Sequence, residues 1–106
     1  MMTAPALTEA LAQRVMGWGV TADRYLTGNR EWMPRWRFEP LTKTEDALRL
    51  LEAAAPDRYE IRQERPGVYS AAVVIGQRVG EARADTKARA ISMAVARAVM
   101  GPEALV

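Results

Sequence analysis

The stretch from Asp85 to Met100, DTKARAISMAVARAVM, constrains the fold most strongly, because as a helix it is apolar on more than one side. At about 100° per residue, one broad arc carries only apolar side chains, namely those of Ala88, Ile91, Ala94, Val95, Ala98 and Val99. The other side mixes apolar with polar residues, which are Met93, Ala96 and Met100 among Asp85, Arg89, Ser92 and Arg97. A helix of this kind is typically buried on several sides. The sequence therefore predicts a central core helix.

The ends of this helix carry recognisable signals. Asp85 is suited to be the N-cap, because its carboxylate can accept from free backbone N–H groups. Gly101 is suited to a left-handed position after the last turn, and Pro102 prevents continuation. The surplus apolar face at Met93 and Met100 is predicted to contact either the N-terminal helix or the same face of a second copy.

The composition excludes several classes of protein. The chain has 106 residues, a formal net charge of +2, and neither cysteine nor histidine. Disulfides, thiolate catalysis and the commonest general base and metal ligand are therefore excluded. No Gly-rich phosphate loop opens a helix, so we expect no catalytic residue, no metal site and no cofactor. No apolar run approaches the roughly 20 residues of a membrane span, so we expect a cytoplasmic protein without membrane contact.

The first 40 residues combine a helix with an irregular, aromatic-rich segment. Residues 4–16 predict a helix, with Pro5 in its first turn and Gly17 after its end. Thr27-Gly28-Asn29 predicts a turn between two short extended pieces, Tyr25–Leu26 and Trp32–Met33.

Residues 41–55 predict a second helix that begins with a capping box of Thr42 and Glu45. Its apolar stripe is expected at five positions, namely Ala47, Leu48, Leu51, Ala54 and Ala55. The acidic residues Glu45, Asp46 and Glu52 are expected to face solvent.

Three strands follow at 58–64, 68–75 and 78–84. The first alternates strictly, the second is apolar on both faces and should be central, and the third carries small residues at Gly80, Ala82 and Ala84. These small residues should allow the last helix to approach closely. The predicted class is α+β, in the order helix, short hairpin, helix, three-stranded antiparallel meander, helix, with both later helices on one face. Residues 1–106 are expected to form one domain, in which 1–40 cover a core of 41–101.

The segment Trp32-Met33-Pro34-Arg35-Trp36-Arg37 interleaves indoles with guanidinium groups. One interpretation places the aromatic residues in the core. The other places Trp32, Arg35, Trp36 and Arg37 on a partner-binding surface, because Trp and Arg are enriched at interfaces. The sequence leaves both interpretations open.

The order and residues of these elements resemble the phage ABA-sandwich domain family. The resemblance rests on Met16-Gly17-Trp18, Tyr25, Trp32-x-Pro34, Ala47-Leu48 and the pattern Asp85-Thr86 … Ala90-Ile91 … Ala94. It covers nearly the whole chain. It implies a phage or prophage origin and a compact fold of helices and strands, without an assigned activity or catalytic residues.

The α-β-β-β-α core is also similar to double-stranded RNA-binding domains, which read duplex shape. If the protein binds nucleic acid, the residues expected to contact backbone phosphate are Arg62, Arg83, Lys87 and Arg89, together with Arg35 and Arg37. The last helix begins with few basic residues, however, and Asp85 adds negative charge there.

The sequence therefore predicts a phage-encoded, non-enzymatic binding protein. Its partner is expected to be a host immune protein or a small nucleotide signal, by association with small phage proteins that block host defence. A homodimer is also compatible with the surplus apolar face. The alternatives are a nucleic-acid-binding protein and a phage structural or assembly component.

Overall fold

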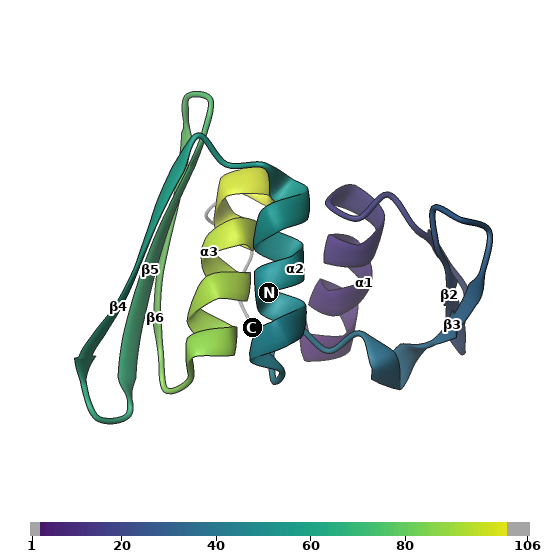
Figure 1. Cartoon of the computed structure of the whole chain (residues 1–106), viewed down its shortest axis with the longest axis horizontal. Helices are drawn as coiled ribbons and strands as arrows, with labels where there is room; N and C mark the ends of the chain where they lie inside the picture. Colours follow the sequence, from purple (N-terminus) through teal and green to yellow (C-terminus); the bar gives the residue numbers. More distant parts are fainter. Residues whose placement is uncertain (1–2, 102–106) are drawn as a thin grey trace.

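The structure is a computed structural model that describes residues 3–101. Its helices lie between two three-stranded antiparallel sheets (Figure 1). From one end to the other, the layers are the large sheet, the helices α3, α2 and α1, and the small sheet. Buried side chains from Leu7 to Ala98 form one continuous hydrophobic cluster. The predicted α+β class is confirmed, and the N-terminal segment contributes to the same core as residues 41–101.

Helix α1 spans Ala4–Arg14, two residues shorter than predicted. The side chain of Thr3 caps it by accepting from the backbone N–H of Ala6 at 3.2 Å, and Pro5 occupies its first turn. Leu7, Leu11 and Ala12 form its buried face. The helix contacts α3, so part of the surplus apolar face of α3 is covered within the chain.

The predicted hairpin is present but belongs to a sheet of three strands. β2 spans Arg24–Leu26 and β3 spans Trp32–Pro34, as expected. The additional strand β1, Gly19–Val20, pairs with β2 on its other side. Because β1 has only two residues, it leaves no periodic pattern in the sequence.

Helix α2 spans Thr44–Ala54, and the predicted capping box is wrong. Lys43 occupies the N-cap position, and no side chain caps the helix there. The hydroxyl of Thr42 is directed to Glu39, whose backbone oxygen lies 3.4 Å away. Residues 41–43, predicted as the start of this helix, instead belong to the connection that precedes it. Pro40 and Leu41 of this connection are buried.

The buried face of α2 also differs from the prediction. Leu48 is 42 % exposed, whereas Leu50 is fully buried. Asp46 was expected in solvent but is buried, because its carboxylate accepts a hydrogen bond from the backbone N–H of Glu39 at 2.9 Å. This bond satisfies the backbone of the connection that precedes the helix.

The large sheet is the predicted meander. It consists of β4 (Arg58–Arg65), β5 (Val68–Ile75) and β6 (Arg78–Ala84), with β5 in the centre. A register shift between Gln63 and Arg65 marks a bulge near the end of β4.

Helix α3 spans Lys87–Met100 and is buried on nearly every side. Its N-cap is Thr86, not Asp85, since the Thr86 hydroxyl accepts from the backbone N–H of Arg89 at 3.2 Å. Gly101 has a positive φ of 95°, but its ψ of 173° lies outside the left-handed helical region that was predicted. Pro102 lies outside the described residues.

The contact of α3 with the sheet confirms the role predicted for the small residues of β6. A Cβ atom on Gly80 would lie only 1.9 Å from the backbone oxygen of Ala94. Ser92, predicted on a polar face, is instead fully buried and donates a hydrogen bond to the backbone oxygen of Pro40 at 2.6 Å. Within residues 3–101, no helix has the length and apolar character to cross a membrane.

Candidate functional site

The aromatic residues divide between the core and the surface, so each of the two sequence interpretations holds for part of them. Tyr25 and Phe38 are buried, and Trp18 packs against both rings, with centroid distances of 5.8 and 4.9 Å. Trp32 and Trp36 are 52 % and 62 % exposed. Tyr25 and Phe38 thus belong to the core, whereas the indoles of Trp32 and Trp36 lie on the surface.

Trp36 borders a groove of about 430 Å³, which we call the Trp36 groove. Its walls come from the start of α1 and from the chain between β3 and α2. The residues that line it are Ala4, Pro5, Thr8, Tyr25, Arg35, Trp36, Phe38, Glu39, Leu41 and Thr42. Most of the exposed lining is apolar, which is typical of sites that receive an apolar group.

Local structure fixes the position of Trp36. It lies in a short 3-10 helix, Arg35–Arg37, which begins directly after Pro34 ends β3. The Nζ atom of Lys43 donates a hydrogen bond to the Trp36 backbone oxygen at 2.9 Å. The Arg37 guanidinium lies 5.5 Å from the centroid of the Trp36 ring. The Lys43 Nζ atom lies 5.9 Å from the same centroid, so two cations contact the exposed indole.

Arg35 connects three elements beneath this surface. Its guanidinium forms an ion pair with Glu9 of α1 and donates from Nε to the Thr21 backbone oxygen at 3.1 Å. It also lies 5.3 Å from the centroid of the Tyr25 ring. Burial raises the pKa of the Tyr25 hydroxyl above its ordinary value, and the nearby positive charge of Arg35 partly opposes this rise.

Trp32 lies apart from the Trp36 groove. It borders a separate hollow with Asp23, Arg24, Met33 and Pro34. The Arg24 guanidinium lies 4.5 Å from the centroid of its ring. Of the residues predicted for partner binding, the structure therefore brings Arg35 and Trp36 into one groove, with Arg37 stacked on the rim, and places Trp32 elsewhere.

The two methionines predicted for the same surface occupy different surroundings. Met93 is only 6 % exposed, which favours the alternative that its face of α3 is covered within the chain. Met100 is half-buried and packs against the core.

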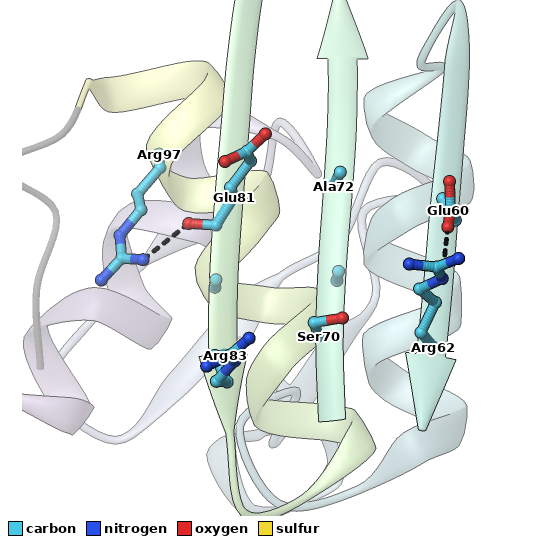
Figure 2. A pocket seen from close by; sticks show the side chains of 9 residues that line it. Glu60, Arg62, Ser70, Ala72, Glu81, Arg83 and Arg97 are labelled. Atoms are coloured by element: carbon cyan, nitrogen blue, oxygen red, sulfur yellow. Dashed lines mark hydrogen bonds and ion pairs between the residues drawn. The ribbon is translucent and has the colours of Figure 1, made fainter. Parts of the chain in front are cut away.

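The arginines of the nucleic-acid alternative lie partly on the outer face of the large sheet (Figure 2). Arg62 and Arg83 flank Ser70 in one row across the sheet, and Glu60 and Glu81 flank Ala72 in the next. This face borders a hollow of about 400 Å³. Arg62 is paired with Glu60 at 2.7 Å, and Arg83 with Glu64 at 2.9 Å.

This alternation of charge is unfavourable for a nucleic-acid backbone. A phosphate that approached Arg62 or Arg83 would meet glutamates at similar distance. Lys87 is exposed and Arg89 half-buried, both in the first turn of α3. They do not lie in the row that contains Arg62 and Arg83.

Sequence reasoning missed most of the groove lining. Phe38 was not among the predicted site residues, and Leu41 and Thr42 were assigned to the second helix. The first turn of α1 gave no signal, because the sequence does not show that it packs near residues 35–42.

The fold is α+β, with helices enclosed by two antiparallel sheets, and the site is an apolar surface groove with an exposed indole. The fold is similar to that of the crystal structure of a phage protein from Bacillus cereus ATCC 14579, with a TM-score of 0.74 over 93 % of this chain and 89 % of that one. The two sequences are 17 % identical, so the likeness establishes the fold alone. No family model and no curated protein matches the chain.

Proposed function

We propose that this chain is a phage-encoded, non-enzymatic protein that binds a host protein at the Trp36 groove. The observation that carries the proposal is the indole of Trp36, 62 % exposed beside a largely apolar groove of about 430 Å³. Tryptophan and arginine beside a pocket are typical of the few residues that contribute most of the binding energy at protein interfaces. The fold likeness to a phage protein supports the phage origin.

The charges at the groove favour a protein over a nucleotide. Arg35 is engaged by Glu9 and by the Thr21 backbone oxygen, so it is not free to bind a phosphate. Glu39 adds a carboxylate to the lining. An apolar or aromatic side chain of a partner fits this lining better than a phosphate group does.

The sequence supports a role without catalysis. The chain contains neither histidine nor cysteine, so the commonest general base and the strongest nucleophile among side chains are missing. Binding alone is then the simplest way for this protein to act, in the cytoplasm of the host.

The finer proposal is that the partner is a component of host defence, which the chain inhibits by occupying it. This step rests on the resemblance to small phage proteins of the ABA-sandwich domain family. A nucleotide signal of the immune system is the alternative ligand, and a structural or assembly role in the phage is the alternative function.

The test compares two exposed indoles in pull-downs from host lysate, followed by affinity measurements with the isolated partner. Trp36→Ala should weaken binding at least about 30-fold, the effect of losing roughly 2 kcal/mol at a hot spot. Trp32→Ala is the matched control, because it removes an indole of similar exposure that lies outside the groove, and it should leave the affinity within about threefold.

Several outcomes would count against the proposal. Equal binding by wild type and Trp36→Ala would exclude the groove as the binding site. Retention on duplex DNA or RNA that falls steeply between about 50 and 200 mM salt would favour the nucleic-acid alternative. A virion protein as the partner would favour the assembly role over inhibition of defence.

A further inference from the structure

The strand β4 forms one margin of the large sheet and is unusually open. It pairs with β5 on one side, and no described residue pairs with its other side. Of its eight residues, only Ile61 is half-buried, and the other seven are exposed. Tyr59, on the face toward the helices, is 57 % exposed. Such an edge presents backbone N–H and C=O groups to which another strand can add.

Side-chain hydrogen bonds join the opposite margin of the sheet, β6, to α3. Arg97 of α3 donates a hydrogen bond to the backbone oxygen of Glu81 in β6 at 2.6 Å. Arg78 of β6 in turn donates to the backbone oxygen of Val99 at 2.8 Å. Because these hydrogen bonds join α3 to β6, the edge of β4 is more accessible to an added strand than the edge of β6.

The charges on the outer face of β4 are self-complementary. Its sequence there reads Arg58, Glu60, Arg62, Glu64. In an antiparallel pair of two β4 strands centred on Ile61, Glu60 lies opposite Arg62 of the second copy, and the bulge between Gln63 and Arg65 limits the regular pairing to residues 59–63. We propose that β4 pairs in this register with β4 of a second copy, which joins the two large sheets into one continuous sheet across a two-fold axis.

Charge also selects this register over its neighbours. A shift that centres the pair on Arg62 or on Glu60 places like charges directly opposite each other, which is destabilising. In the proposed register, the face toward the helices brings Ile61 against its own copy and Tyr59 beside Gln63. Both copies gain burial of the exposed Tyr59 ring in addition to backbone hydrogen bonds.

The ion pair within β4, Arg62 with Glu60, does not oppose this pairing, and the pair of Glu64 with Arg83 lies beyond its regular part. The pair of Arg62 with Glu60 is well exposed on both sides, and exposed pairs contribute little to stability. Their exchange for pairs between copies therefore costs little. The bulge after Gln63 ends the regular pairing. Because the contact uses the same edge of both copies, it closes on itself, so a dimer is expected.

The proposal is independent of the Trp36 groove, because β4 lies in the large sheet, at the end of the molecule opposite the small sheet (Figure 1). Sedimentation equilibrium of the full chain should show a mass that rises with concentration from 11.8 kDa to twice that value. A wild-type mass that stays at one chain up to about 1 mM would overturn the proposal.

Charge variants then test the register. Arg62→Glu and Glu60→Arg, each alone, place like charges opposite each other at two symmetric contacts, so each should weaken the dimer at least about tenfold. An equimolar mixture of the two variants restores every opposite-charge contact and should form a heterodimer. The double variant E60R/R62E is likewise complementary and should dimerise as the wild type does.

These variants also separate the proposed surface from any other. All the changed side chains are solvent-exposed, so the variants should remain folded, which circular dichroism checks. Dimerisation of each single variant at wild-type strength, or no association in the mixture, would show that β4 is not the interface.

Discussion

At the scale of single residues, burial separates side chains that look alike in the sequence. Trp36 and Phe38 are two positions apart, yet one is largely exposed and the other fully buried. The sequence indicates that these aromatic side chains lie either in the core or on the surface. The packing of Phe38 against Trp18 and Tyr25 in the structure shows that Phe38 belongs to the core. Ser92 is a similar case, because its acceptor, the Pro40 oxygen, lies 52 positions away.

Replacement of Ser92 tests that buried hydrogen bond. Ser92→Ala leaves the Pro40 oxygen without its donor inside the core, so the free energy of unfolding should fall by about 1–3 kcal/mol. Ser70→Ala, on the outer face of the sheet, is the control and should change it by less than about 0.5 kcal/mol. Urea unfolding measures both. Equal effects would mean that the bond at Ser92 contributes nothing.

Tyr25 should make stability depend on pH in the alkaline range. Its pKa in the folded state is raised above the ordinary value of a tyrosine hydroxyl, chiefly because burial disfavours the phenolate. The unfolded state therefore releases this proton first, and stability that is fully present below about pH 10 is lost as pH rises above it. Tyr25→Phe should lose less stability than the wild type between about pH 8 and pH 11 in urea unfolding. Identical losses would contradict this account.

At the scale of elements, the strongly periodic segments were predicted correctly and the boundaries set by distant contacts were not. The meander and the last helix follow from alternation and from apolar periodicity. The start of α2 was misplaced, because the Thr42 and Glu45 motif suggested a capping box whereas the chain at 39–41 is held by Asp46 and Ser92 instead. β1 was missed because two residues carry no period.

The close contact between β6 and α3 can be tested at Gly80. Gly80→Ala places a methyl group within 1.9 Å of the Ala94 backbone oxygen, so the helix must shift or the strand must bend. The free energy of unfolding should fall by about 1–3 kcal/mol or more. Gly28→Ala is the control, since no atom lies within 4 Å of its added Cβ, and it should change stability by less than about 1 kcal/mol. Thermal or urea unfolding that ranks the two variants equally would contradict the close approach.

At the scale of the whole molecule, element order was predictable but the layers and the groove were not. The helices lie between two sheets (Figure 1) because α3 is apolar nearly all round and is covered by the large sheet, by α2 and by α1. The Trp36 groove arises where residues 4–8 meet residues 35–42, a contact that no local pattern specifies. The arrangement leaves the groove and the open edge of β4 on separate surfaces.

The partner is expected to occupy the Trp36 groove. The most direct measurement is photo-crosslinking in host cells, with a photoreactive aromatic residue in place of Trp36, of Trp32 or of Tyr59, followed by mass spectrometry. All three side chains are exposed, but only Trp36 borders the groove. We expect a host-protein adduct from position 36, none from position 32, and an adduct with a second copy of the chain from position 59. A host-protein adduct from position 32 or 59 with none from position 36 would contradict it.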